Sequence, residues 1–369
     1  MFRVAPLRPG RRLLAAATAM TTPLLPEDFL GLIDPLWSTT QLRGRVVARR
    51  RETDRAVSVT IAPGRDWAGH RAGQYVRVGI DVDGVRYWRS YSLSGAATSP
   101  GGGDTGMLTI TVQEVPGGVV SRKLVRDLPI GTIVALEQAQ GDFVLPPSPS
   151  PLLMVTAGSG ITPVMGMLRT LDAAGAVPDV VVVHSAPTAT GSIFAAELAA
   201  MADRRDGLRV ITRHTAEGSS RDGHGHPQGR LDLAELDELV PDWRERQAYV
   251  CGPAGLLEAA EDHWAETPER LRVERFTAPV RSTGGSGGRV EYGEKAVDVE
   301  PDTSLLEAGE AAGVLMPSGC RMGICFGCVL PLRDGQVRDL RTGDVHGEPG
   351  DLVQTCISGA SGTARLDTP

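Results

Sequence analysis

The chain has 369 residues, more than one hydrophobic core usually organises, so two or three domains are expected. Hydrophobic residues make up 41% and charged residues 22%, a globular balance that excludes a largely disordered chain. The net charge of -7 argues against a general affinity for nucleic acid, because its phosphates require dense Lys and Arg.

Residues 1–40 form a leader and an N-terminal extension. The first 19 contain four Arg, no acid and a short apolar patch, so an export signal is one interpretation. We favour an upstream start codon read into an Arg-rich leader, because Met20 begins a more ordinary start and the patch is at the short limit for a signal core. No apolar run is long enough to cross a bilayer.

Residues 41–148 are predicted to form a small antiparallel β-barrel. Short β-rich runs separated by Gly and Pro lie at 44–47, 56–61, 75–80, 108–112 and 133–136. Many short strands with regular turns are typical of such a barrel. The Pro-rich stretch at 146–151 then ends the domain, because proline provides no ladder donor and fixes its own backbone.

Residues 149–277 are predicted to form a parallel α/β domain. Apolar strands at 152–156, 180–184, 210–212 and 248–251 alternate with helical segments at 165–171, 193–201 and 256–263. Buried strands that alternate with helices are typical of a parallel sheet. A linker at 278–288 follows, and its Gly and Ser content predicts flexibility.

The last domain, 289–369, is predicted to begin with a hairpin at 289–299 and a helix at 304–312 that Asp302 or Thr303 could cap. It holds 7 basic and 13 acidic residues, so most of the net charge lies here. We expect this acidic domain to meet a basic partner surface. A merely solvated acidic face explains the charge equally well.

Four of the five cysteines lie in this last domain, and an odd total does not suit a disulfide framework. Cys320, Cys325 and Cys328 have the spacing C-x4-C-x2-C and Cys356 follows at a distance, which is the plant-type 2Fe-2S pattern. Zinc is the alternative, but zinc motifs usually pair two C-x2-C arms. The domain resembles a plant-type ferredoxin, which implies a β-grasp fold with these four cysteines as cluster ligands.

The segment Arg89-Ser90-Tyr91-Ser92-Leu93 resembles the RxYS flavin motif of the ferredoxin-NADP reductase superfamily, whose first domain is a barrel of the predicted kind. The resemblance implies that Arg89 pairs with the flavin pyrophosphate and that Tyr91 covers the isoalloxazine ring. It places Ser92 at the ring edge that accepts hydride, with Leu93 alongside. Tyr91 and Ser92 are therefore catalytic candidates.

A second segment, 115–121, resembles the pyrophosphate-binding turn of the same superfamily, which leads into a short helix. Gly117 and Gly118 permit close approach of the phosphates, while Val119 and Ser121 begin the helix. The superfamily contains FAD and FMN types. Because the long turn before residue 108 and the Gly-Gly-x-x-Ser helix start resemble the FAD type, we expect FAD.

The turn at 157–163 follows an apolar strand and precedes a helix, and it resembles the GxGxTP nucleotide-binding turn of the superfamily. Gly158 and Gly160 are expected to admit the dinucleotide backbone. Thr162 is expected to hydrogen-bond near the nicotinamide, with Pro163 next to it.

Cys251-Gly252-Pro253 matches the CGP element, which implies that Cys251 lies beside the nicotinamide and takes part in catalysis. The alternative for a lone cysteine is a small buried apolar residue. Phe276, in Glu274-Arg275-Phe276, resembles the terminal aromatic near the flavin in related reductases, although packing on the barrel would explain it equally.

The choice between NADPH and NADH depends on residues that would neutralise the ribose 2'-phosphate. Ser185, Arg213 and Arg221 are the candidates, and they give a slight preference for NADPH. We interpret His224 and His226 as loop residues rather than a metal site.

A hydride carries two electrons and a 2Fe-2S cluster accepts one, so the flavin, which can hold one or two, must lie between them. We expect electrons to pass from NAD(P)H through FAD and the cluster to a separate protein. The resemblance is close to actinobacterial desaturase and oxygenase reductases, which implies a terminal oxygenase or a membrane-bound fatty-acid desaturase as partner. The chain is then a cytoplasmic monomer, at most peripheral at the membrane. A stand-alone quinone, ferric or dye reductase and a redox sensor are the alternatives.

Overall fold

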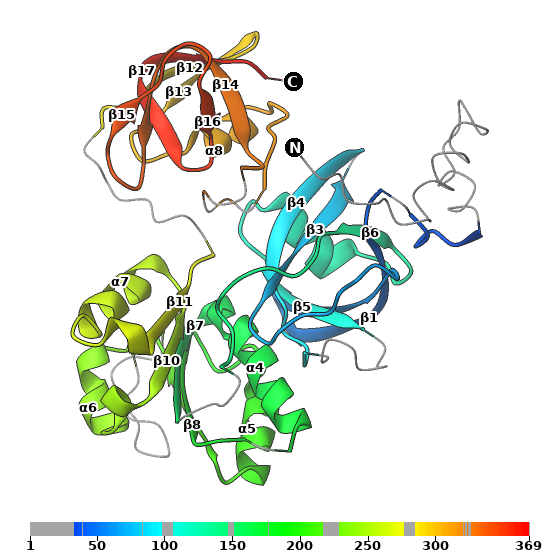
Figure 1. The fold of residues 1–369 in the computed structure, drawn as a ribbon, viewed down its shortest axis with the longest axis vertical. Helices are drawn as coiled ribbons and strands as arrows, with labels where there is room; N and C mark the ends of the chain where they lie inside the picture. The colour runs from blue at the N-terminus through cyan, green and yellow to red at the C-terminus, as the bar shows by residue number, and fades with distance from the viewer. Residues whose placement is uncertain are drawn as a thin grey trace, which may run out of the picture.

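The computed structural model forms three units in chain order (Figure 1). It describes residues 33–38, 40–82, 84–97, 106–146, 151–175, 177–216, 229–276, 285–319, 321, 323 and 326–368. The predicted leader, most of the Gly/Ser linker, Arg221, His224, His226, Cys320 and Cys325 lie outside these residues.

The first unit is an antiparallel sheet closed into a barrel. Its strands are β1 (Arg43–Thr53), β2 (Ala56–Pro63), β3 (Tyr75–Val82), β4 (Val85–Ser92), β5 (Leu108–Gln113) and β6 (Ile133–Leu136). They are ordered β4-β3-β6-β1-β2-β5, and a bridge between Leu93 and Ile110 joins the two edge strands. The amides of Ser94 and Gly95 both donate to the Thr109 carbonyl and complete the closure.

Alternation along the strands fills the barrel with small aliphatic side chains. In β3, for example, Val76, Val78 and Ile80 are buried at every second position, as the two-residue period of a strand requires. The helix α3 (Val119–Arg122) and the π-helical turn that follows it contribute Val120, Leu124 and their neighbours to this core. The predicted barrel is confirmed.

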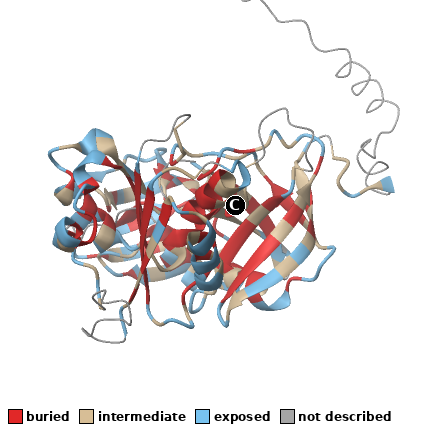
Figure 2. Ribbon diagram, turned by 90° about the horizontal axis from the view of Figure 1, so that it is seen from below, coloured by how far each residue is buried: buried red, intermediate tan, exposed pale blue. Residues whose placement is uncertain are grey.

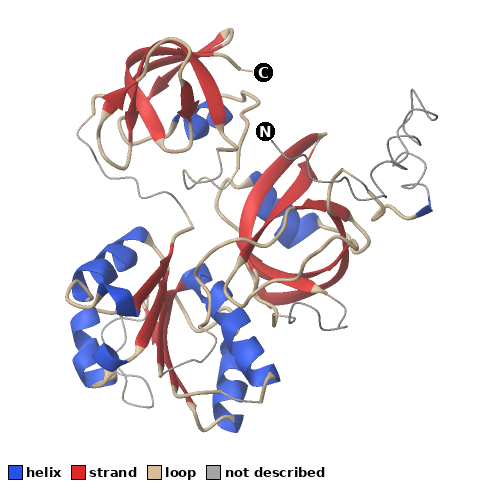
Figure 3. Cartoon of the chain, in the orientation of Figure 1, coloured by secondary structure: helices blue, strands red, loops and turns tan. Residues whose placement is uncertain are grey.

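The second unit is a parallel sheet with helices on both faces (Figure 3). Its strands are β7 (Leu152–Ala157), β8 (Val180–Ala186), β9 (Leu208–His214), β10 (Gln247–Cys251) and β11 (Leu271–Glu274), in the order β11-β10-β7-β8-β9. Its helices include α4 (Ile161–Ala173), α5 (Ala195–Arg204), α6 (Leu236–Leu239) and α7 (Ala254–His263). One apolar cluster joins α4 and α5 to the sheet and a second joins α6 and α7, so the strands are buried on both faces (Figure 2).

The third unit is a mixed sheet packed on one helix. It contains β12 (Gly288–Tyr292), β13 (Lys295–Val299), α8 (Leu305–Ala311), β14 (Val329–Asp339), β15 (Val345–His346), β16 (Leu352–Gln354) and β17 (Ser358–Leu366). The order is β13-β12-β17-β14-β15, with β16 paired to β14 and only β12 and β17 parallel among these pairs. The predicted fold class is thus confirmed in all three units.

The prediction of the α8 cap was wrong. Ser304, which the sequence placed inside the helix, has an extended backbone and its Oγ accepts a hydrogen bond from the Glu307 amide at 3.2 Å. Serine caps a helix as well as aspartate does, so Asp302 and Thr303 were two equally plausible but earlier candidates.

The barrel and the nucleotide-binding unit meet with no room for an added methyl group. A Cβ at Gly166 of α4 would lie 2.2 Å from the Leu93 carbonyl oxygen of the barrel. Tyr249 of β10 donates its hydroxyl to the Val144 carbonyl at 2.8 Å, and Arg169 donates to the Ser94 carbonyl at 2.6 Å. The end of β4 is therefore held directly against the nucleotide-binding unit.

Among the described helices none is long and apolar enough to span a bilayer.

Candidate active site

Strand β4 carries the predicted flavin motif to the edge of the barrel. Tyr87, Arg89 and Tyr91 occupy alternate positions and so share one face of the strand. The Arg89 guanidinium lies 5.9 Å from the Tyr87 ring centroid and donates to the Trp88 carbonyl at 2.8 Å. Burial raises the pKa of Tyr91 above its ordinary value, which keeps the phenol neutral. Leu93 is fully buried, and its amide donates to the Gln74 carbonyl at 2.8 Å, fixing the end of the motif.

A hydroxyl, a carboxyl and a thiol meet where the barrel joins the nucleotide-binding unit. Ser92 donates a hydrogen bond of 3.2 Å from its Oγ to Oε2 of Glu274 at the end of β11. Cys251, at the end of the adjacent strand β10, is paired in register with Glu274. Burial raises the pKa of Glu274 to about 8, against the opposing effect of the Ser92 hydrogen bond. Burial, with the Glu274 charge adding to it, also raises the pKa of the Cys251 thiol.

The raised pKa of Glu274 favours its protonated form near neutral pH, where the group is hydrogen-bonded to the predicted hydride-edge serine. A carboxyl group with its pKa raised toward neutrality and a defined partner is suited to hold or release a proton. In the sequence, Glu274 belongs to the motif Glu274-Arg275-Phe276, of which only Phe276 was predicted to lie in the site. The available signal was a lone acid at the end of a strand, just before the aromatic Phe276, which is 39% exposed.

The turn between β7 and α4 brings two glycines into different situations. Gly158 has φ of +56° and an added Cβ there would meet no atom within 4 Å, so its surface is open to a ligand. A Cβ on Gly160 would lie 2.1 Å from the Cys251 carbonyl oxygen. The small size of Gly160 is thus required by packing against β10. Thr162 donates to the Ser159 carbonyl at 2.9 Å and closes the first turn of α4, in which Pro163 is buried.

Gly252 and Pro253 lead from β10 into α7, where Pro253 occupies the N-cap position. β7 and β10 are neighbouring parallel strands. The chain continues from β7 to β8 on one side of this pair and from β10 to β11 on the other side, so the strand order reverses between them. A crevice beyond the carboxyl ends of strands at such a switch point is the usual nucleotide site of an α/β sheet. Gly158, Cys251 and Glu274 all lie at this edge.

Two of the residues predicted to recognise the ribose 2'-phosphate, Ser185 and Arg213, lie side by side on β8 and β9. Ser185 is paired in register with Ala157 and Arg213. The Arg213 side chain is buried, and its Nη1 donates to Oε2 of Glu235 at 2.7 Å. It also approaches the carbonyls of Gly229 and Arg230, at 3.3 and 3.4 Å. The guanidinium therefore already holds the end of β9 in place.

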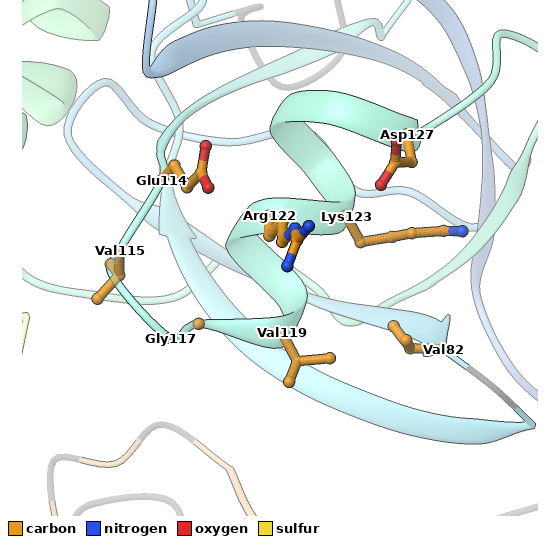
Figure 4. Close-up of a pocket in the computed structure, with 9 residues that line it drawn as sticks. Val82, Glu114, Val115, Gly117, Val119, Arg122, Lys123 and Asp127 are labelled. Atoms are coloured by element: carbon orange, nitrogen blue, oxygen red, sulfur yellow. The ribbon is translucent and has the colours of Figure 1, made fainter.

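The predicted pyrophosphate turn is closed by its own serine. Ser121 Oγ accepts from the Val115 amide at 3.1 Å and lies 3.4 Å from the Gly118 carbonyl, while Gly117 has φ of +74°. A cavity of about 360 Å³ lies at this turn (Figure 4). It is lined by Val82, Glu114, Val115, Gly117, Gly118, Val119, Arg122, Lys123 and Asp127. The helix thus places Arg122 and Lys123 beside an open glycine turn.

Two of the predicted cluster ligands, Cys328 and Cys356, are buried near each other. Hydrogen bonding from Cys356, more than any other contact, lowers the pKa of Cys328 to about 6, although burial opposes the shift. The Thr355 hydroxyl donates to the Cys328 carbonyl at 2.7 Å and ties the start of β14 to the turn before β17. Thiols that ionise readily suit iron, which is bound by thiolates.

The segment just before the cysteine loop, residues 320–328, lies against the flavin motif. Ser318 Oγ, just before the loop, is 3.5 Å from Nη1 of Arg89, and the two residues are 229 positions apart in the chain. A flavin-type motif, a nucleotide crevice and a cysteine loop that meet around one end of a barrel define a reductase with several redox groups.

Comparisons with known proteins agree with this class. The chain matches the family models of the oxidoreductase FAD-binding domain over residues 57–145, the oxidoreductase NAD-binding domain over 154–262 and the 2Fe-2S iron-sulfur cluster binding domain over 290–360. It is 48% identical to an NADPH oxidoreductase of Mycobacterium tuberculosis, across 95% of this chain and 90% of that protein. It is 28% identical to the glycine betaine monooxygenase reductase subunit of Pseudomonas aeruginosa, across 80% and 87%.

Among solved structures, phthalate dioxygenase reductase shares the fold with a TM-score of 0.61 at 22% identity, over 89% of this chain and 98% of that one. The chain belongs to the ferredoxin-NADP reductase superfamily, in the group whose members carry a 2Fe-2S domain. It is an NAD(P)H oxidoreductase with FAD-binding and iron-sulfur domains. The predicted family, enzyme class and cofactor set are thereby confirmed.

Proposed function

We propose that this enzyme takes hydride from NADPH and delivers single electrons, through FAD and its own 2Fe-2S cluster, to a separate terminal oxygenase or membrane-bound fatty-acid desaturase. The observation that carries the proposal is the meeting of Ser92 with Glu274 on one side of β4 and of Arg89 with Ser318 on the other. One strand of the barrel therefore contacts both the nucleotide-binding unit and the cysteine loop.

We assign the flavin to β4 and to the turn before α3. In this proposal Arg89 pairs with a phosphate and Tyr91 covers the ring, while Gly117 and Gly118 leave backbone space for the pyrophosphate. The cavity beside this turn has room for more than a phosphate. Arg122 and Lys123 line it and can pair with phosphate oxygens, and Glu114 and Asp127 line it as well. These features support FAD over FMN, because only FAD has a second nucleotide half to place there.

When bound, the flavin accepts hydride from the nicotinamide and gives up electrons singly. The chain's own residues orient the partners and manage the proton. Ser92 would hydrogen-bond the reacting edge, Cys251 and Gly158 would shape the nicotinamide site, and Glu274 would hold the proton that Ser92 can exchange. Thr162, Pro163, Gly252 and Pro253 fix the two turns that frame this site.

We propose that NADPH is the preferred nucleotide, with Ser185 closest to the 2'-phosphate, while Arg213 on the adjacent strand, buried and paired with Glu235, supports the strand that carries the site. The mycobacterial relative is named an NADPH oxidoreductase, which supports this choice. Ser185→Asp would place a negative charge beside the phosphate. We expect the KM for NADPH to rise about tenfold or more while the KM for NADH changes little. Equal changes in the two KM values would contradict the assignment.

We propose that Cys320, Cys325, Cys328 and Cys356 hold the cluster. Cys325→Ser should abolish reduction of cytochrome c and preserve reduction of ferricyanide, which the flavin can serve directly. Cys251→Ser is the matched control, because it removes a thiol but should leave the iron content unchanged. Undiminished cytochrome c reduction by Cys325→Ser would instead favour a stand-alone reductase.

The acceptor is proposed from two kinds of support. The Pseudomonas relative is a monooxygenase reductase subunit, and the third unit is acidic, which suits a basic docking surface. We expect a cytoplasmic monomer that associates with its acceptor only transiently. Pull-down with the reduced protein, followed by reduction of the captured candidate with NADPH, tests this. A candidate that binds but is never reduced would not be the acceptor.

A further inference from the structure

Glu310 stands between two guanidinium groups that belong to different units. It lies one residue before the end of α8 in the 2Fe-2S unit, and its Oε1 forms an ion pair with Arg321 of the cysteine loop. The same oxygen is 3.9 Å from Nη2 of Arg89 in the barrel. Arg89 is also the residue that lies 3.5 Å from Ser318. One carboxylate oxygen therefore connects the flavin motif to the loop that carries the cysteines.

The position of Glu310 is unfavourable for α8 taken by itself. A negative charge in the last turn of a helix is repelled by the helix dipole, so cations nearby must compensate. Arg321 and Arg89 provide them. The three side chains are about one quarter exposed, at 24% and 25%, so solvent screens their interaction less than it screens an ordinary surface pair.

The two arginines need the acid between them. Burial and the positive charge of Arg321 lower the pKa of Arg89, and Glu310 acts in the opposite direction. Without Glu310, two positive charges from different units would face each other across a half-buried contact. The contact would then favour separation of the units.

Arg89 has donors enough for two partners. A guanidinium has five N–H groups in a fixed plane, of which Nη1 serves the Trp88 carbonyl and Nη2 faces Glu310. Other donors remain for a phosphate. Binding of a flavin phosphate by Arg89 and docking of the 2Fe-2S unit are therefore compatible.

We propose that Glu310 is a positioning residue that docks the 2Fe-2S unit on the flavin barrel, holding Arg89 of the barrel and Arg321 of the cysteine loop at once. Its effect on electron transfer rests on the proposed function. In that step the reduced flavin loses one electron and the oxidised cluster gains one, and no covalent bond forms or breaks. Docking itself is a property of the folded chain and is measurable without turnover.

The experiment compares the wild-type holoenzyme with Glu310→Arg, Glu310→Gln and Asp334→Arg. Asp334 is exposed on β14 of the same unit, so its substitution matches the charge change of Glu310→Arg without touching Arg89. Small-angle X-ray scattering gives the radius of gyration, and anaerobic stopped-flow absorbance gives flavin and cluster reduction by NADPH. Iron content and the visible spectrum check that each variant holds its cluster.

We expect Glu310→Arg to increase the radius of gyration and to slow cluster reduction by about tenfold or more, with flavin reduction unchanged within about twofold. Glu310→Gln should shift both quantities in the same direction by less, and Asp334→Arg should shift neither. Wild-type scattering and wild-type cluster reduction in both Glu310 variants would overturn the proposal. If Glu310→Arg loses its cluster, Glu310→Gln decides by the same two criteria.

The two proposals fail in different ways. If the wild-type cluster is never reduced by NADPH, the electron relay is wrong, while scattering still reports whether Glu310 docks the unit. If cluster reduction is fast in every variant and the radius of gyration is constant, the relay stands and the docking role is wrong.

Discussion

Where the barrel meets the nucleotide-binding unit, backbone packs against backbone beside two charged side-chain contacts, Arg169 with the Ser94 carbonyl and Arg50 with Glu197. Where it meets the 2Fe-2S unit, the contacts described are made by long polar and charged side chains. At the first contact Gly166 leaves no room for a Cβ beside the Leu93 carbonyl, and Ser92 reaches Glu274 directly. At the second, Arg89 meets Glu310 at 3.9 Å and Ser318 at 3.5 Å. Hydride transfer requires reacting atoms in contact, which a rigid contact provides. An electron can be passed by a unit that docks and separates.

The largest effect should come from opening the rigid contact. Gly166→Ala would place a methyl group 2.2 Å from the Leu93 carbonyl oxygen, so the two units must move apart. We expect NADPH-dependent ferricyanide reduction to fall about a hundredfold, because a displacement of about 1 Å can cost that much. Steady-state kinetics provide the measurement.

Gly255→Ala is the matched control for Gly166→Ala. Gly255 also lies in a helix of the nucleotide-binding unit, but an added Cβ there meets no atom within 4 Å. This substitution should keep the wild-type rate and slightly raise stability, since Ala favours helix over Gly. A wild-type rate in Gly166→Ala as well would mean that the contact is not tight.

The next effect concerns the proton at the same contact. Glu274→Gln keeps the shape and the hydrogen bond with Ser92 but cannot exchange a proton. We expect flavin reduction to slow by about ten- to a hundredfold. Because the protonated acid is the active form and its pKa is about 8, the wild-type rate should fall as the pH rises through 8. Stopped-flow measurements should show that this limb is missing in Glu274→Gln.

The same carboxyl group should make the free energy of unfolding depend on pH. Its pKa is about 8 in the folded protein, against an ordinary value of 4.5 for a solvated glutamate, so between these values the folded chain binds a proton that the unfolded chain releases. The free energy of unfolding should therefore decrease as the pH rises from 4.5 to 8, by up to about 1.4 kcal/mol per pH unit. Urea unfolding of the flavin-free protein measures this slope. A Glu274→Gln variant with the wild-type slope would assign it to another group.

The smallest effect should appear at the charged contact. Salt screens half-buried ion pairs only in part, so 0.5 M NaCl, a concentration at which the Debye length is under about 8 Å, should slow cluster reduction by about two- to threefold. Flavin reduction should slow less than cluster reduction, because Gly166, Ser92 and Glu274 rely on packing and a hydrogen bond, and the Arg50–Glu197 ion pair at that contact lies beside the packed residues. Equal slowing of both steps would remove the distinction between the two contacts.

The sequence predicted those elements whose apolar residues indicate directly that they are buried. The apolar runs predicted at 152–156 and 180–184 became the buried parallel strands β7 and β8. β4 was not among the predicted strands, because Val85–Ser92 alternates charged and aromatic residues instead of aliphatic ones. The cysteine spacing predicted the cofactor of the third unit, and the family models agree.

Long-range contacts could not be predicted in this way. Gly160 looks like a ligand-facing glycine in the sequence, yet its size is required by the Cys251 carbonyl on another strand. The pKa of Glu274 is raised by burial beside Ser92 of the barrel, a neighbour 182 positions away in the chain. The contact of Arg89 with Glu310 joins distant segments whose local patterns carry no trace of each other.

The most direct test of the electron relay is anaerobic rapid mixing of the holoenzyme with one equivalent of NADPH, followed by optical and electron paramagnetic resonance spectra at increasing delays. We predict that flavin absorbance is lost first and that the signal of the reduced 2Fe-2S cluster then grows, before any cytochrome c is added. A fully reduced flavin beside a cluster that stays oxidised, in protein that still reduces cytochrome c, would contradict the account.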